Sequence, residues 1–235
     1  MIILKGRRMK YTKVRHAIFL NRPNRFIAHV LLDGREEIVH VKNTGRCREI
    51  LREGTEVILE EGGNPDRKTR YSIIAAYKGD MLINIDSQAP NRVVYDAIKE
   101  GRLTSFSNTT VLSREVTFGN SRFDIYFENS AKKGFIEVKG VTLERDGIAL
   151  FPDAPTERGA RHAYEMAGAL KEGYAGCIFF LLQLKGAKYF TPNKDMDYEF
   201  FRALSEAKRK GVGILAFDSV ITENSIELGG EIRVV

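Results

Sequence analysis

The sequence predicts an α/β protein that begins with an all-β part, and three observations support this fold class. Short segments rich in β-branched and aromatic residues, separated by Gly and Pro turns, fill the first third of the chain. From Asn91 onward the order becomes helix, three strands, helix, strand, helix, strand. Two of the later strands, 176–184 and 212–220, are largely apolar, as strands buried on both faces are. We therefore expect one domain over 1–85 and, over 86–235, a mixed sheet flanked by helices.

Composition places the chain among globular proteins with a substantial core. Of its 235 residues, 43% are hydrophobic and 29% are charged, which is ordinary for soluble domains. The sequence has no apolar run of transmembrane length and no signal-peptide core, so we expect a cytoplasmic protein without a membrane partner. Cys47 and Cys177 are isolated and lack metal-site spacing, which argues against a structural zinc and gives a disulfide no support.

The excess of positive charge is confined to the first third. Residues 1–85 hold 17 Lys and Arg against 10 Asp and Glu, a net +7, whereas residues 86–235 hold 20 against 21, a net −1. An asymmetry of this kind favours a polyanionic partner, most simply nucleic acid. A generally basic surface that serves solubility is the alternative.

The first part has the pattern of a small antiparallel barrel. Strand patterns cover 11–20, 25–32, 37–42, 56–60, 70–77 and 81–85. Asp33-Gly34 is a tight-turn signal between the second and third of these segments. Five or six short strands suit an OB-like barrel, a fold that often binds single-stranded nucleic acid. The strand count alone does not separate it from an SH3-like barrel.

Three loops of this part, 22–26, 42–46 and 64–71, combine cations, amides and flat rings. Arg and Lys bind phosphates, and unpaired bases stack on planar side chains. The nucleic-acid contacts predicted from these loops are Arg22, Asn24, Arg25, Asn43, Arg46, Arg67, Lys68 and Arg70. For any single loop, turn chemistry with solvated charges is the alternative, and Phe26 fits a core position as well as a stacking one.

Helical spacing marks three helices in the second part, over 91–100, 156–172 and 197–210. Pro90 and Thr156 are start signals for the first two. Asp96 and Glu100 lie one turn apart on the polar side of the first helix, where each either reaches a metal or is solvated.

On the second helix, Arg158, His162 and Glu165 share roughly one side, at steps of three and four residues. A single His on a helix is usually the structural partner of a neighbouring acid. Arg158 has two readings, as a phosphate ligand and as the partner of Glu165.

Between the first two helices, a strand over 111–118 precedes a hairpin with strands at 121–127 and 135–139, the second lengthened by 141–143. Glu137 and Lys139 are two residues apart and share one face, and Asp124 comes opposite that face. Two carboxylates suit Mg²⁺, and a Lys beside such an ion orients water or offsets charge on a phosphate. A surface ion pair on an ordinary hairpin is the alternative.

This order of elements, with an acid on the second strand and Glu-x-Lys on the third, resembles the core of the PD-(D/E)xK nuclease superfamily. Asp124 would match the metal-binding aspartate of that superfamily, and Glu137 with Lys139 its (D/E)xK pair. The 13 positions between the two acids, 137 − 124, are what one hairpin crossing requires. Because the motif is degenerate, the order of elements carries much of this match.

Seven motifs cover nearly the whole chain: Pro23-Asn24-Arg25-Phe26, Asn43-Thr44-Gly45-Arg46, Asn64-Pro65 with Arg67-Lys68-Thr69, Ser121-Arg122-Phe123-Asp124, Glu137-Val138-Lys139, Phe151-Pro152-Asp153-Ala154 and Thr156-Glu157-Arg158-Gly159. In this order they resemble the sugar fermentation stimulation protein A family. The resemblance implies an OB-like N-terminal domain, a nuclease-like C-terminal domain, DNA binding and a link to the regulation of sugar-catabolism genes. Cys47 stands where we expect Met, which touches no predicted catalytic role.

The first functional hypothesis is a nuclease that depends on Mg²⁺ or Mn²⁺. Its expected catalytic residues are Asp124, Glu137, Lys139, Arg158 and His162. The two acids and the main-chain carbonyl of Val138 would hold the metal, and Lys139 would position water or stabilise the transition state. Arg158 and His162 would contact the scissile phosphate or orient a ligand.

The second hypothesis is a DNA-binding regulator that keeps a nuclease-derived scaffold without cutting. The sequence has no evident helix-turn-helix, so such a regulator would read DNA in another way. A third reading is a protein-interaction module with a basic surface, which leaves the grouped acids and lysine unexplained. The expected partner is DNA, single-stranded or branched, and the oligomeric state stays open, a homodimer included.

Overall fold

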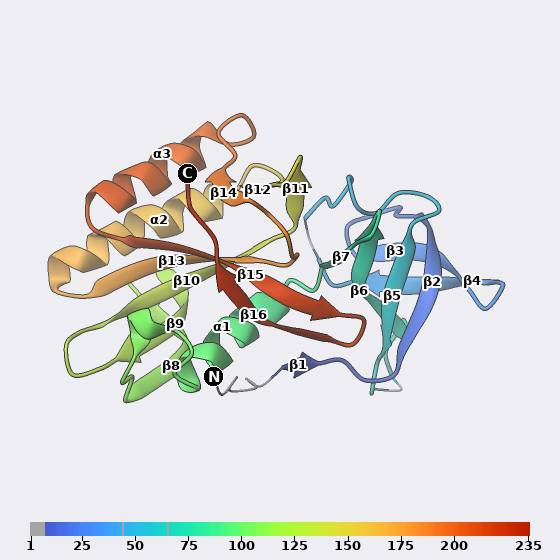
Figure 1. Cartoon of the computed structure of the whole chain (residues 1–235), viewed down its shortest axis with the longest axis horizontal. Helices are drawn as coiled ribbons and strands as arrows, with labels where there is room; N and C mark the ends of the chain where they lie inside the picture. The colour runs from blue at the N-terminus through green and yellow to red at the C-terminus, as the bar shows by residue number, and fades with distance from the viewer. Residues whose placement is uncertain (1–7, 44, 65) are drawn as a thin grey trace.

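The structure, a computed structural model, describes residues 8–43, 45–64 and 66–235. Two parts lie side by side, a small barrel on the right of Figure 1 and a larger layered part on the left. Residues 1–7 of the first predicted domain, and the motif residues Thr44 and Pro65, lie outside the described residues.

Six strands build the barrel region: β2 (Val14–Asn21), β3 (Ile27–Leu32), β4 (Arg35–Val41), β5 (Glu56–Glu61), β6 (Tyr71–Lys78) and β7 (Met81–Asn84). They follow the order β4-β3-β2-β5-β6-β7, and a parallel pairing of β4 with β6 closes five of them into a barrel. Alternate side chains point inward, as Ala28, Val30 and Leu32 of β3 do. The predicted OB-like barrel is confirmed.

The second part is a seven-stranded mixed sheet in the order β1-β16-β15-β13-β10-β9-β8. Its strands are β1 (Met9–Lys10), β8 (Val111–Phe118), β9 (Ser121–Glu128), β10 (Lys133–Val141), β13 (Ala175–Leu182), β15 (Gly213–Thr222) and β16 (Ser225–Glu231). The central strands β10, β13 and β15 are parallel, and the outer pairs are antiparallel.

Helices cover both faces of this sheet, as the fold class predicts. The helix α1 (Ala89–Lys99) packs on one face through Val93, Val94 and Ala97. On the other face lie α2 (Glu157–Ala169), which continues into a 3₁₀ turn over Leu170–Glu172, and α3 (Tyr198–Arg209). Among the described residues, no helix is both long enough and apolar enough to cross a membrane.

Three features of the sheets differ from the expectation. The strand β1 lies within the range predicted for the barrel, yet it pairs with β16 and so joins the second sheet. Residues 141–143 do not simply lengthen the hairpin, because β10 ends at Val141 and Leu143 begins β11. A small sheet of β11 (Leu143–Arg145), β12 (Ile148–Phe151) and β14 (Tyr189–Pro192) was not predicted, since strands of three or four residues are too short to show a period.

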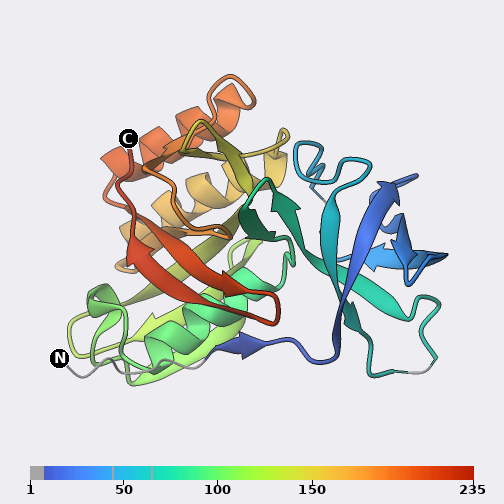
Figure 2. The ribbon, with the colours of Figure 1, turned by 45° about the vertical axis from the view of Figure 1, so that its right-hand side comes forward.

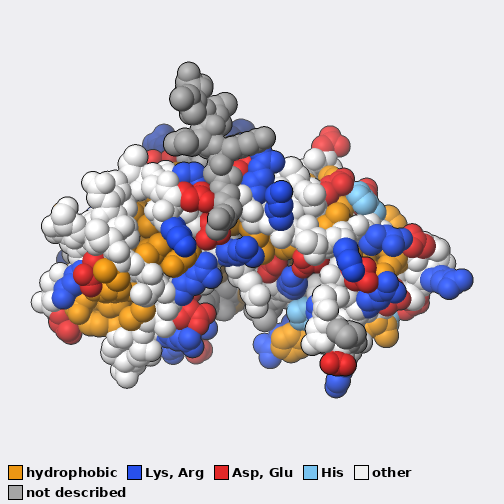
Figure 3. All heavy atoms as spheres, turned by 90° about the horizontal axis from the view of Figure 1, so that it is seen from below, with side chains coloured by type: hydrophobic (Ala, Val, Ile, Leu, Met, Phe, Trp, Pro, Cys, Tyr) orange, Lys and Arg blue, Asp and Glu red, His pale blue; other side chains and the backbone are white. Residues whose placement is uncertain are grey.

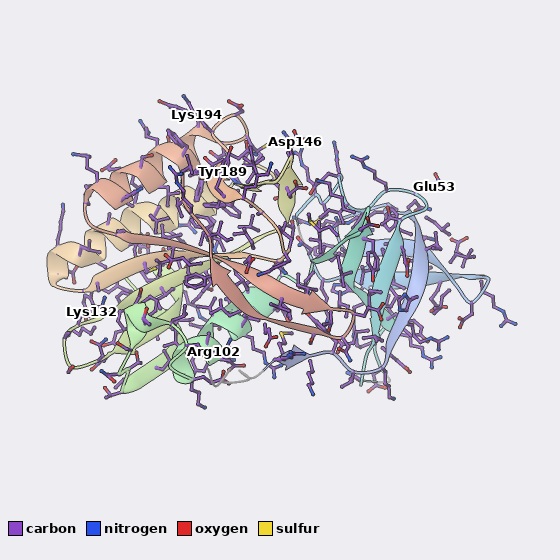
Figure 4. The ribbon with its side chains drawn as sticks, in the orientation of Figure 1. Glu53, Arg102, Lys132, Asp146, Tyr189 and Lys194 are labelled. Carbon is purple, nitrogen blue, oxygen red and sulfur yellow. The ribbon has the colours of Figure 1, made fainter. Side chains whose placement is uncertain are left out.

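The barrel contacts the second part at the carboxyl ends of its parallel strands. Gln183, directly after β13, donates from Nε2 to Asn84 Oδ1 at 2.8 Å. Lys78 of β6 donates from Nζ to Glu144 Oε2 at 2.5 Å, and Figure 2 shows the barrel strands running toward this boundary. Lys132, in the β9–β10 turn, lies at the far end of the hairpin (Figure 4). In open α/β sheets, ligands bind outside the carboxyl ends of the strands, which is where the barrel sits.

Candidate active site on the β9–β10 hairpin

The antiparallel pairing of β9 with β10 ends beside the predicted carboxylates. The ladder runs as far as Ile136↔Ile125, and Asp124 and Glu137 are the next residues. There the Val138 N–H donates to the Asp124 side chain, at 2.8 Å from Oδ2. The N–H and C=O of a strand residue point to the same neighbouring strand, so the Val138 carbonyl also faces Asp124. The two strands thus separate at the place where the acids stand.

The strand β9 changes sides at Asp124. Phe123 packs toward α2, with its ring centroid 5.9 Å from that of His162, whereas Ile125 belongs to the core under α1. Strict alternation would put both side chains on one face. Opposite Asp124 in β8, Glu115 has a φ of +54°, an uncommon conformation for a residue with a side chain. Local backbone distortion of this kind is concentrated at functional sites.

The carboxylate of Asp124 is held at both oxygens. Oδ1 accepts a hydrogen bond from Asn91 Nδ2 of α1 at 2.7 Å, and Oδ2 accepts the one from Val138. Burial, reinforced by the neighbouring charge of Glu137, raises the pKa of Asp124 to about 6, although these hydrogen bonds oppose the shift. Asn91 was missed by the sequence reasoning, because a single Asn in the first turn of a helix carries no signal of its own.

The two carboxylate oxygens of Glu137 differ in their hydrogen-bond partners. Oε1 accepts from Lys139 Nζ at 2.6 Å and from His162 Nδ1 at 2.5 Å, whereas Oε2 is buried and has no hydrogen-bond partner among the described residues. Burial by itself raises the pKa of this carboxyl, but Lys139 and His162 outweigh it and leave the pKa lowered. Glu137 is therefore an ionised carboxylate with one oxygen to spare.

His162 orients Glu137 from behind. The imidazole is 2% exposed, which excludes it from contact with a phosphate and leaves the orienting role. Its Nε2 lies 3.4 Å from Arg158 Nε. Because a guanidinium only donates, Nε2 must accept and the proton is assigned to Nδ1, which faces Glu137. Arg158 itself is exposed, so its remaining N–H groups are free to meet an anion.

A hollow of about 290 Å³ opens next to Gly140, the residue after Lys139. Its walls come from the barrel loop at Gly45, the segment 151–156 and Gln183. The hollow therefore lies between the two parts of the protein, and the residue that follows Lys139 in β10 is part of its wall.

We expect Gly140→Ala to destabilise the protein by about 1–3 kcal/mol, the usual cost of overpacking. A Cβ at this position would collide with the Gln183 side chain and would stand 2.8 Å from Pro90 Cγ. Chemical denaturation measures the change. Gly168→Ala is the matched control, because a Cβ there meets no atom of the described residues within 4 Å and a helix interior favours Ala over Gly. Equal stability of the two variants would contradict the packing argument.

We expect Asn91→Leu to weaken binding of a divalent cation about tenfold or more, since residues that orient metal ligands typically contribute 10- to 100-fold. Loss of the Nδ2 donor would leave Asp124 Oδ1 without its partner. Calorimetric titration of Mn²⁺ measures the affinity. Arg92→Ala, one residue further along α1 and exposed, should bind as the unmodified protein does.

The two acids predicted on the first helix do not join the site. Asp96 lies 3.8 Å from both Arg92 and Arg114, and Glu100 accepts from Arg102 Nε at 2.9 Å. The Asp96 carboxylate is thus engaged on the surface of α1, and the Glu100 carboxylate is engaged in the turn that follows this helix.

Three of the residues predicted to bind nucleic acid form hydrogen bonds within the loops. The Arg22 guanidinium donates to four main-chain carbonyl oxygens, those of Arg25, Asn43, Gly45 and Arg46, at 2.6–2.9 Å. Asn24 accepts from the N–H groups of residues 26 and 27, and Asn43 joins the loop to the carbonyl of residue 85. These side chains stabilise the turns of the loops, which is the alternative role expected for a single loop.

The other predicted contacts differ in whether their side chains already have a partner within the protein. Arg70 forms an ion pair with Glu61 at 3.0 Å, and Arg67 donates to a hydroxyl of β6 at 2.8 Å. Arg25, Arg46 and Lys68 are exposed. On the face in Figure 3, basic and acidic side chains are interspersed, so the basic excess does not form one continuous patch there.

Comparison with known proteins covers both parts of the chain. The family described as the SfsA N-terminal OB domain matches residues 20–85, and the sugar fermentation stimulation protein RE domain matches residues 88–225. A sugar fermentation stimulation protein homolog of Alkaliphilus oremlandii is 57% identical over 231 residues, covering 96% of this chain and 98% of that protein. One of Ruminiclostridium cellulolyticum is 50% identical over 226 residues, covering 96% and 99%.

A solved structure extends the likeness to three dimensions. The Pyrococcus furiosus SfsA structure, described as a complex with Ca²⁺, is 28% identical and superposes with a TM-score of 0.89, covering 97% of this chain and 98% of that one. The resemblance drawn from the seven motifs is confirmed. With both of its parts matched in order by that family, this chain belongs to the sugar fermentation stimulation protein (SfsA) family.

Proposed function

We propose that this protein is a Mg²⁺- or Mn²⁺-dependent phosphodiesterase that cuts DNA. The observation that carries the proposal is the buried Oε2 of Glu137, which has no hydrogen-bond partner among the described residues, on a carboxylate whose charge acts on Asp124. A buried polar atom without a partner costs about 1–3 kcal/mol, so a protein keeps one for a reason. A cation between the two acids would supply the missing partner.

The donor set fits a hard divalent ion. Asp124 and Glu137 offer carboxylate oxygens and Val138 offers a main-chain carbonyl that faces the same side. One or two carboxylates with waters and substrate phosphate are the usual surroundings of Mg²⁺. The Ca²⁺ named in the description of the Pyrococcus furiosus protein is also a hard, oxygen-seeking ion, which supports a cation site in this family member.

The reaction is hydrolysis of a phosphodiester. A water oxygen forms the new bond to phosphorus, the bond to the leaving oxygen breaks, and that oxygen takes up a proton. Bound Mg²⁺ would lower the pKa of the water and neutralise charge on the phosphate. Lys139, in contact with Glu137, orients the water or stabilises the charge that develops, and His162 keeps the Glu137 carboxylate in place. Arg158, which is exposed, would contact the phosphate.

We also propose that the two parts have separate roles, in which residues 1–85 hold the nucleic acid and residues 86–235 cut it.

The test of the proposed cleavage is incubation of the purified protein with labelled linear, flapped and branched DNA in Mg²⁺, Mn²⁺, Ca²⁺ or EDTA. We expect cutting with Mg²⁺ or Mn²⁺ and none in EDTA. Binding without a nick under every condition would overturn the nuclease and favour the non-cutting regulator.

A further inference from the structure

Four arginines converge on a second hollow, on the loops of the barrel. It has a volume of about 360 Å³, and Arg22, Arg25, Arg46 and Arg48 line it over an apolar floor that includes Phe19. None of the described residues that line it is acidic. Of the four, Arg48 was not among the predicted nucleic-acid contacts, since no aromatic or turn residue beside it marks it out.

The four arginines lack a short-range acidic partner among the described side chains. No ion pair between described residues involves any of the four, whereas Arg15 and Arg70 of the same barrel are each paired with an acid. Like charges brought into one hollow repel each other, and an anion placed among them removes that repulsion. Guanidinium groups are also the side chains best suited to phosphate, through paired N–H donors.

Arg22 has a different role from the other three. Its four bonds to main-chain carbonyls tie the loop that precedes β3 to the loop that follows β4. Burial lowers the pKa of its guanidinium, as expected for a group held inside the loops. The side chains of Arg25, Arg46 and Arg48 are exposed at the rim and remain available to a ligand.

The arginine hollow adjoins the hollow beside the candidate active site. Gly45 lines both of them, and the Arg46 N–H donates to Asp153 Oδ2 of the second part at 3.0 Å. The Asp153 carboxylate lies at this junction, so a negatively charged nucleic-acid strand has to pass beside this carboxylate. The hollow of about 290 Å³ in turn reaches Gly140, next to Lys139.

The outer strand face of the barrel offers a different surface. Ile18, Leu31 and Ile38 are between 38% and 51% exposed there. On that face the His29 imidazole lies 2.5 Å from Glu36 Oε1. A surface that presents aliphatic side chains and an acid does not favour a polyanion, although this face is the one that many OB folds use.

We infer that the arginine hollow binds the phosphodiester backbone of a single nucleic-acid strand, which runs from Arg48 over Gly45 toward the candidate site. The inference deepens the proposed function and rests on it for what happens to the strand at its far end. The loops of the barrel, rather than its strand face, thus make the contact.

The test measures binding of labelled single-stranded oligothymidine by fluorescence anisotropy in EDTA, so that cutting does not interfere. Each phosphate contact on a single strand contributes about 0.7 to the slope of log K against log salt concentration. We expect Arg46→Ala and Arg48→Ala each to lower the slope by about 0.7 and the affinity several-fold. Arg48→Lys, which keeps the charge, should keep most of the slope.

Arg35→Ala and Lys13→Ala are matched controls, because both residues are exposed cations of the barrel region that do not line the hollow. Their slopes should equal that of the unmodified protein. Thermal melting identifies any variant that fails to fold, and Arg25→Ala then replaces it in the series. Unchanged slopes in the arginine variants, or an equal loss in the controls, would overturn the inference.

Failure of this inference is distinguishable from failure of the proposed function. Lys139→Ala should bind with an unaltered slope and lose cutting. If Lys139→Ala cuts normally while the arginine variants lose slope, the arginine site stands and the nuclease site is wrong. If the arginine variants bind normally while Lys139→Ala is inactive, the nuclease site stands and the arginine site is wrong.

Discussion

Replacing Lys139 by methionine is expected to reduce cleavage about 10²- to 10³-fold, the usual cost of removing one charged group aimed at the transition state. The Lys139 ammonium contacts Glu137 Oε1 at 2.6 Å, and the side chain is 15% exposed, so Lys139 is less buried than the carboxylate that it contacts. Methionine keeps the aliphatic stem and removes only the charge.

The same substitution separates catalysis from metal binding. The Lys139 ammonium competes with a cation for the Glu137 carboxylate, so without it the affinity of the site for Mn²⁺ should stay equal or rise. If the role of Lys139 were only structural, its loss would disorder the strand and lower the affinity for Mn²⁺. Cleavage rates under single-turnover conditions and calorimetric titration give the two readings. Lys133→Met, at the exposed far end of the same strand, is the control and should cut normally. Normal cutting by the Lys139 variant would place the active site elsewhere.

Replacing Asp124 by asparagine is expected to stabilise the metal-free protein at neutral pH while abolishing divalent-cation binding, although the amide keeps only one acceptor oxygen for the N–H donors of Asn91 and Val138, at a cost of about 1 kcal/mol. The pKa of Asp124 is raised to about 6 by burial and by the charge of Glu137, from about 4 in an unfolded chain. Between these two values the folded protein holds a proton that the unfolded chain has released. Raising the pH through this window therefore favours unfolding, and the protein loses stability that the Asp124→Asn variant would retain.

A shift of about two pKa units corresponds to about 3 kcal/mol at most, since each unit is worth about 1.4 kcal/mol. For a chain of this size the gain should raise Tm by several degrees, at about 2–4 °C per kcal/mol. Melting curves in EDTA from pH 4 to pH 8 measure it. The advantage should be full above pH 6 and absent near pH 4. An Asp124→Asn protein less stable than the unmodified one at pH 8 would contradict the burial argument.

Local patterns were sufficient to locate the main elements and three of the site residues. Alternation over 121–127 and 135–139 predicted the hairpin, and the spacing of Glu137 and Lys139 placed them together. Each of these inferences depends on neighbours a few residues away, for which the pleat of a strand or the turn of a helix dictates the outcome. The barrel followed in the same way, from strand lengths and turn signals.

Side-chain partnerships were decided only by the tertiary structure. Asn91 meets Asp124 across 33 residues of sequence, and Arg22 turns away from solvent to hold the loop at Gly45. The sequence by itself determined which residues share a strand face or a helix side. The packing of distant elements decided which of them are buried, which are paired and which stay open to a ligand, because the free energy of burying a polar group depends on every group that surrounds it.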